Sequence, residues 1–193
     1  MKFFFIFLTL ISNWCMSQNT TKKITLGGGC FWCIEAAFED VKGVNSAISG
    51  FSGGKIKNPS YKEVVSGKTN HAEVCQITYD SEIISLKSIL ELFFLVHDPT
   101  TINRQGNDVG RHYRSIILYH YDEDLEFIKN EINRYNKDYY NNEIVTEINK
   151  YEVFYSAEEY HQEYYKRNMN QPYCKIVIEP KLQKARELLK RYY

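Results

Sequence analysis

Cys30 is the residue whose surroundings point most directly to chemistry. It follows three glycines at 27–29 and opens an apolar helical pattern, so its sulfur is expected at a helix N-terminus. Free backbone N–H groups and the helix dipole stabilise an anion there, which should lower the pKa of a thiol and favour the thiolate. The glycines leave room for a substrate to approach the sulfur. The sequence therefore predicts a nucleophilic Cys30.

Two other functions for these thiols compete with this interpretation. Cys30 and Cys33 form a C-x-x-C pair, which is typical of thioredoxin-like dithiol oxidoreductases, although none of the four prolines stands convincingly before an apolar strand as that fold requires. The same pair, together with His71 and Cys75, also has the spacing of zinc ligands. A structural zinc-binding module is therefore the non-enzyme alternative, and metal analysis of the purified protein would test it.

The elements that must position Cys30 follow from the hydrophobic periodicity. Ser156 with Glu159 has the spacing of a capping box and predicts a helix start, and residues 100–112 form a polar loop. The order β-α-β-β-α-β predicts an α+β fold, a ferredoxin-like two-layer α/β sandwich with appended C-terminal helices. The pattern predicts strands at 24–26, 44–51, 72–79 and 113–120, an extended segment at 144–155, and helices over 34–41, 86–93, 125–135 and from Pro180 onwards.

Composition limits the classes of protein to which the chain can belong. It has 193 residues, of which 44% are hydrophobic, so it is long enough for a real core and resembles neither a disordered chain nor a multispanning membrane protein. Lys+Arg and Asp+Glu each count 24, and the resulting zero net charge argues against nucleic acid as a partner. Five cysteines do not suit a fully paired disulfide scaffold.

The first 17 residues resemble a secretory signal peptide. Lys2 precedes an apolar run at 3–11 that is too short to span a bilayer, and Cys15-Met16-Ser17 is a tolerable cleavage site. We therefore expect a mature single domain over 18–193 that is exported to the periplasm or cell envelope, with no membrane contact beyond export. If residues 1–17 are not cleaved, the protein would stay in the cytoplasm.

Several motifs of the mature chain, in the right order, resemble those of the peptide methionine sulfoxide reductase A family. These are GGGCFWCIEAAFE at 27–39, SGFSGG at 49–54, NPSYKEVVSGKTNHAEV at 58–74, HDPTTINRQGNDVGRHYRS at 97–115 and AEEYHQEYYKRNMNQPYC at 157–174. The resemblance implies a peptide-methionine (S)-S-oxide reductase, which returns the S epimer of methionine sulfoxide, free or in proteins, to methionine. It also implies that Cys30 is the nucleophile and that Phe31 and Trp32 bind the substrate by cradling its S-methyl group.

The same resemblance implies roles for four further residues. Glu73 is similar to the family's proton donor, Tyr61 and Tyr113 to the hydroxyl donors to the sulfoxide oxygen, and Asp108 to a residue that shapes that network. Sulfoxide oxygen must be protonated before a thiol can displace it, so an acid beside the nucleophile is chemically required. An apolar environment on the predicted strand would raise the pKa of Glu73 and keep its proton available.

A second thiol must complete the cycle, because oxygen transfer leaves Cys30 as a sulfenic acid. Cys174 resembles the family's resolving cysteine, with Cys33 as the alternative, and Cys75 is expected to be a buried bystander. The resulting disulfide would be reduced by thioredoxin or a similar dithiol, without any cofactor or metal. The expected partners are therefore the sulfoxide substrate and this reductant, and the protein is expected to be a monomer.

Overall fold

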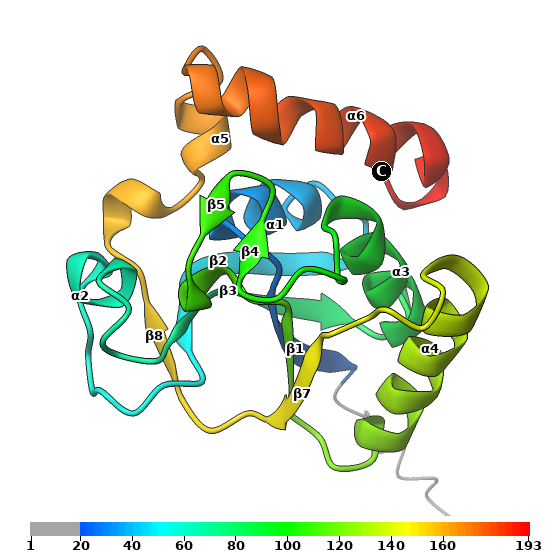
Figure 1. Cartoon of the computed structure of the whole chain (residues 1–193). Coiled ribbons are helices and arrows are strands. Elements are labelled where there is room, and N and C mark those ends of the chain that lie inside the picture. Colours follow the sequence, from blue (N-terminus) through cyan, green and yellow to red (C-terminus); the bar gives the residue numbers. More distant parts are fainter. Residues whose placement is uncertain (1–19) are drawn as a thin grey trace, which may run out of the picture.

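A six-stranded sheet lies at the centre of residues 20–193, the part of the chain that the computed structural model describes (Figure 1). The predicted signal peptide at 1–17 lies outside the described residues. The strand order is β7-β6-β1-β3-β2-β8, and all neighbours are antiparallel except β6 and β7. The strands are β1 Thr21–Gly27, β2 Val44–Ser52, β3 Ala72–Asp80, β6 Ile116–Tyr119, β7 Glu147–Lys150 and β8 Phe154–Ser156.

The four central strands, in the order β6-β1-β3-β2, have the ferredoxin-like arrangement that the sequence predicted. Helix α1 (Phe31–Phe38) connects β1 to β2, and α3 (Leu86–Val96) connects β3 to β6. Each connection skips one position in the sheet, so that an antiparallel strand separates the two strands it joins. The predicted α+β fold is thereby confirmed.

The main hydrophobic core lies between the sheet and the helices α1 and α3. Helix α6 (Glu179–Leu188) packs on α1 and α3 as an outer element, which confirms the appended C-terminal helix (Figure 1). Helix α4 (Asp124–Tyr139) adds Ile128 and Ile132 to the same core. Within residues 20–193, no helix combines the length and apolar character needed to cross a membrane.

The other face of the sheet carries a smaller apolar cluster of Ala72, Val74, Ile116 and Leu118. Tyr151 and Phe154 pack against it, and they belong to the segment predicted to be extended at 144–155. That segment forms two strands at opposite edges of the sheet, β7 beside β6 and β8 beside β2.

The helix predicted to begin at Ser156 does not form there, so that prediction was wrong. Ser156 ends β8, and the turn that follows is a 3-10 helix at Glu159–His161 without a side-chain cap. Long-range pairing of β8 with β2 satisfies the backbone in place of the local capping pattern. A capping box does form at Ser60 and Glu63, where it starts the short helix α2 (Tyr61–Val65).

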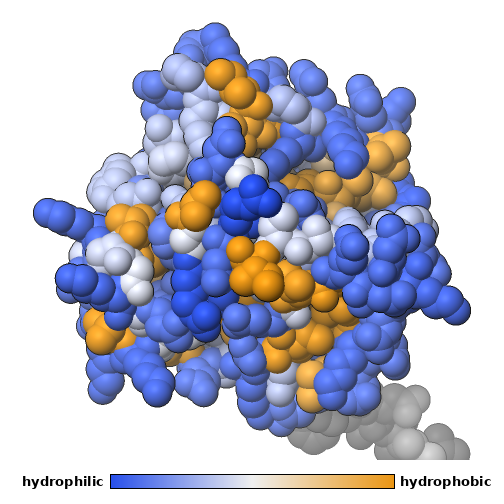
Figure 2. All heavy atoms as spheres, viewed as in Figure 1, coloured by the Kyte–Doolittle hydropathy of each residue, from blue (hydrophilic) through white to orange (hydrophobic). Residues whose placement is uncertain are grey.

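The predicted polar loop at 100–112 contains a small hairpin, β4 (Arg104–Gln105) with β5 (Asp108–Val109), followed by a 3-10 turn at Arg111–Tyr113. Tyr113 therefore lies in this turn rather than on a strand, because β6 begins only at Ile116. Figure 2, drawn from the same side as Figure 1, shows separate hydrophobic patches among hydrophilic residues.

Candidate active site

Cys30 is the N-cap residue of α1, at the helix start that the sequence predicted, and its side chain makes no capping bond. A Cβ added at Gly28 would lie 2.9 Å from the His97 ring, and one at Gly29 would lie 2.5 Å from the Gln105 side chain. Gly29 also has a φ of +91°, which favours glycine. The glycines thus let the chain pass between His97 and Gln105 and fix Cys30 at the start of α1.

Glu73 lies on β3 beside the first turn of α1. The backbone N–H of Phe31 donates a hydrogen bond to Glu73 Oε2 at 3.2 Å, and Oε1 is buried without a hydrogen-bond partner among the described residues. Burial raises the pKa of Glu73 to about 8, and the bond from Phe31 opposes this only in part. The carboxyl group therefore keeps its proton at neutral pH and has a free oxygen with which to deliver it.

Tyr61 reaches this place from the β2–β3 connection, and Asp108 and Tyr113 both reach it from the α3–β6 connection. Burial raises the pKa of Tyr61 to about 12, and the charges of Glu73 and Cys30 act in the same direction. Burial likewise raises the pKa of Tyr113, with contributions from Glu73 and then Tyr61. Both phenols keep their protons and can donate hydrogen bonds. The structure therefore brings the five residues with predicted catalytic roles into one site.

Tyr173 is a member of this site that the sequence reasoning missed. Its hydroxyl donates a hydrogen bond to Asp108 Oδ2 at 2.7 Å, and it also interacts with the thiols of Cys30 and Cys33. No local pattern marked Tyr173 among 16 tyrosines, because its position depends on how the C-terminal segment packs against the β4–β5 hairpin.

Phe31 and Trp32 lie in an aromatic cluster at the start of α1. Trp32 stacks on Tyr164 with ring centroids 3.6 Å apart and planes 6° from parallel. The His161 ring lies 5.1 Å from Phe31 and 4.4 Å from Tyr61, and it is 2% exposed. Neither ring nitrogen of His161 has a hydrogen-bond partner among the described residues. The sequence reasoning also missed His161 and Tyr164, for which only the 157–174 motif was a signal.

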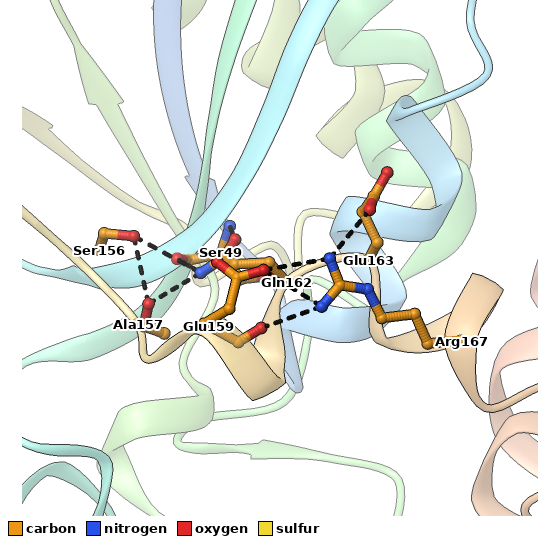
Figure 3. Close-up of polar contacts among 7 residues, drawn as sticks. All are labelled: Ser49, Ser156, Ala157, Glu159, Gln162, Glu163 and Arg167. Carbon is orange, nitrogen blue, oxygen red and sulfur yellow. Dashed lines mark hydrogen bonds and ion pairs between the residues drawn. The ribbon is translucent and has the colours of Figure 1, made fainter.

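The segment that carries His161 and Tyr164 is tied to the sheet by polar contacts (Figure 3). The Gln162 amide accepts a hydrogen bond from the backbone N–H of Ser49 at 3.1 Å and donates one to its carbonyl at 2.9 Å. Arg167 contacts the side chains of Glu159 and Glu163. The bonds of Gln162 to β2 hold His161 and Tyr164, here called the aromatic wall, beside α1, although both residues come from a distant part of the chain.

The thiols of Cys30 and Cys33 are both buried and form a hydrogen-bonded pair. Burial raises the pKa of Cys30 well above its ordinary value, and Cys33 and Glu73 add to the increase. The hydrogen bond from Cys30 lowers the pKa of Cys33. The expectation of a lowered pKa at Cys30 is therefore wrong for this closed arrangement, because burial outweighs the effect of the helix N-terminus.

The other described cysteines are also free and buried. Burial raises the pKa of Cys174, and Cys33 acts in the same direction. Cys174 begins a π-helix that packs against α1, the helix that carries Cys33. Burial also raises the pKa of Cys75, followed by the charges of Glu35 and Glu39. Cys33 thus interacts with both Cys30 and Cys174, whereas Cys75 has a different set of neighbours.

His71, which the zinc alternative requires, is engaged in other contacts. Its Nδ1 accepts a hydrogen bond from the Gly54 N–H at 3.1 Å, and its Nε2 donates one to the Ile56 carbonyl at 2.8 Å. Both ring nitrogens are therefore used to hold the 54–56 loop. No group of three or more potential metal-ligating His, Cys, Asp or Glu side chains occurs within residues 20–193.

Comparisons with known proteins cover most of the described chain. A model of the family described as "Peptide methionine sulfoxide reductase" matches residues 22–192. The peptide methionine sulfoxide reductase MsrA of Sulfolobus acidocaldarius is 54% identical over 160 residues, which are 83% of this chain and 90% of that protein.

Among solved structures, reduced Mxr1 from Saccharomyces cerevisiae has a TM-score of 0.76 at 36% identity, covering 80% of this chain and 90% of that one. Mxr1 in complex with Trx2 has a TM-score of 0.55 at 28% identity, covering 75% and 85%. The likeness therefore covers most of both chains.

Proposed function

The chain belongs to the peptide methionine sulfoxide reductase A family, and from that premise we propose how its residues carry out the reaction. The protein is a peptide-methionine (S)-S-oxide reductase, which reduces S-epimer methionine sulfoxide to methionine with electrons from thiols. One observation carries the assignment of roles. The protonated Glu73 carboxyl is buried beside the start of α1 and has one oxygen without a protein partner.

In the proposed first step, the Cys30 sulfur attacks the sulfoxide sulfur while Glu73 protonates the sulfoxide oxygen, and the proton that the Cys30 thiol loses returns to the Glu73 carboxylate. Oxygen passes from substrate to enzyme, so methionine is released and Cys30 becomes a sulfenic acid. Tyr61 and Tyr113 donate hydrogen bonds to the oxygen, and Asp108 orients this network. Phe31 and Trp32 hold the methyl group, and His161 and Tyr164 extend the wall that positions the substrate.

In the second step, we propose that Cys33 rather than Cys174 attacks the sulfenic acid. The Cys30–Cys33 disulfide forms and the oxygen leaves as water, so one thiol is oxidised and no external oxidant is needed. The hydrogen bond between Cys30 and Cys33, and the lowered pKa of Cys33, support this order. Cys174, which interacts with Cys33, would then accept the disulfide by thiol–disulfide exchange.

A thioredoxin-like dithiol is the proposed final reductant. This is supported by the solved complex of the relative Mxr1 with Trx2. We also propose that residues 1–17 direct export and that the 18–193 domain repairs oxidised proteins outside the cytoplasm as a monomer. N-terminal sequencing of the protein recovered from each cell fraction would test the export proposal.

The reaction is tested with separate S and R methionine sulfoxide, dithiothreitol, and either the wild-type or the Cys30→Ser enzyme. We expect methionine only from the S epimer and only with wild type. Absence of an S-specific product from wild type would refute the proposed roles. The resolving step is tested by one turnover without reductant, followed by mass spectrometry. A Cys30–Cys174 linkage formed first in wild type would restore Cys174 to the resolving role.

A further inference from the structure

Tyr173 occupies a central position in the site although no step of the reaction uses it. Its hydroxyl donates to Asp108 Oδ2 at 2.7 Å. Its ring meets Trp32 edge-on, with centroids 5.9 Å apart and planes at 78°. Tyr173 therefore contacts both Asp108, which orients the polar network, and Trp32, which lines the pocket for the methyl group.

Tyr173 also covers the nucleophile. Its hydroxyl interacts with the thiols of Cys30 and Cys33, and Cys30 is only 7% exposed. The substrate needs the same volume, because its sulfur must contact the Cys30 sulfur while its methyl group lies against Phe31 and Trp32. Because Cys30 is nearly covered, a sulfoxide can reach its sulfur only where a neighbouring side chain gives way, and the Tyr173 hydroxyl is the neighbour that interacts with both thiols.

The residues just before Tyr173 lie at the surface, whereas Tyr173 and Cys174 pack inside. Residues 169–172 are exposed, and the backbone hydrogen bonds on either side of Tyr173 are local: Gln171 donates to the Asn168 carbonyl, and Lys175 donates to the Gln171 carbonyl. Cys174 then begins a π-helix that runs to Ile178. Wide helical turns of this kind are uncommon and often lie at functional sites.

We propose that Tyr173 is a gate: in the reduced resting enzyme its hydroxyl occupies the sulfoxide subsite, and substrate enters only when residues 168–174 move away. This inference rests on the proposed function of the site. Because Tyr173 and Cys174 are consecutive, the movement that admits substrate also exposes Cys174, which is 0% exposed in the closed arrangement. Substrate arrival would thereby prepare the thiol that passes electrons between the site and the reductant.

The first test measures how fast iodoacetamide alkylates Cys30 in the fully reduced enzyme, by peptide mass spectrometry. Loss of the charge-assisted bond to Asp108 in Tyr173→Phe should open the gate and raise this rate about tenfold. Tyr173→Ala, which also removes the ring, should raise it at least as much. Tyr139→Phe on the exposed face of α4 is the control and should leave it unchanged.

The second test uses the substrate. The KM of Tyr173→Phe for S-methionine sulfoxide should fall about tenfold, because substrate no longer competes with the hydroxyl. In Cys30→Ser, which cannot turn over, the S epimer should speed maleimide labelling of Cys174 and the R epimer should not.

Unchanged alkylation in both Tyr173 variants would overturn the gate, and so would a lower kcat with an unchanged KM, since that pattern belongs to a catalytic donor. The alkylation rate of Cys30 can be measured without turnover, so it tests the gate separately from the activity. If wild type were inactive on S-methionine sulfoxide while Tyr173→Phe raised the alkylation rate, the proposed function would be refuted and the gate would stand.

Discussion

Glu73→Gln should inactivate the enzyme and, at the same time, stabilise the protein at neutral pH. Glutamine has nearly the shape of a protonated carboxyl group, and its oxygen can still accept the Phe31 N–H bond. It cannot deliver a proton, so we expect kcat to fall by about a thousandfold, within the usual range for loss of a general acid.

The gain in stability follows from the pKa of Glu73, which is about 8 in the folded protein against an ordinary value of 4.5. Between these two pH values the unfolded chain has lost a proton that the folded chain keeps. The stability of wild type therefore falls by about 1.4 kcal/mol per pH unit as pH rises from 4.5, and the loss ends near pH 8. At pH 7.5 the stability that wild type has lost through Glu73 amounts to about 4 kcal/mol.

Glutamine carries no such penalty, but its amide N–H groups lack a partner where Oε1 now lies, which costs about 1 kcal/mol. We therefore expect the free energy of unfolding of Glu73→Gln to exceed that of wild type by about 3 kcal/mol at pH 7.5. At pH 5 the two free energies should be nearly equal.

Urea denaturation of both proteins at pH 5, 6, 7 and 7.5 measures this difference directly. Other titrating groups are common to the two proteins and cancel. Glu82→Gln, on an exposed turn, is the control, and its stability should fall with pH in the same way as that of wild type. If the difference in free energy of unfolding between Glu73→Gln and wild type stayed constant with pH, the reasoning would be refuted. That result would mean that Glu73 is ionised in the folded protein.

Three other substitutions test the loop and the aromatic wall. Gly29→Ala should lower stability by about 2 kcal/mol, because alanine is strained at φ +91° and its Cβ meets the Gln105 side chain; thermal denaturation checks this. Tyr164→Leu should raise the KM for methionine sulfoxide about fivefold, because the stack on Trp32 is lost. Steady-state kinetics measures this, and an unchanged KM would contradict the role of Tyr164. Gln162→Ala should cost about 2 kcal/mol in urea denaturation by removing two bonds to the β2 backbone, and a loss below 0.5 kcal/mol would count against that tether.

The sequence allowed the ferredoxin-like core and the position of Cys30 to be predicted, because both depend on local patterns. Apolar spacing identified α1 and α3, and the glycines marked the turn before Cys30. The capping-box rule failed at Ser156 because pairing with β2 is a long-range interaction that no local pattern reports.

The same limit applies to the site. Tyr173, His161 and Tyr164 act beside α1 only because the C-terminal segment packs there, so their roles were not visible in the spacing of residues. The pKa of Cys30 was misjudged for a related reason, since burial is a property of the whole fold.

The pairing of β8 with β2 sets the order in which the enzyme can mature. Ser49 and Gln162, which join these regions, are 113 residues apart in the chain. Contacts of such large separation carry a high loop-closure entropy and tend to form late in folding. The helix that holds the nucleophile, Phe31 and Trp32 can form from neighbouring residues, whereas His161 and Tyr164 reach the site only after the last strand has paired. A chain that is still folding would thus have its thiol before its complete substrate site, and a nascent chain that ends before β8 would lack His161, Tyr164 and Tyr173.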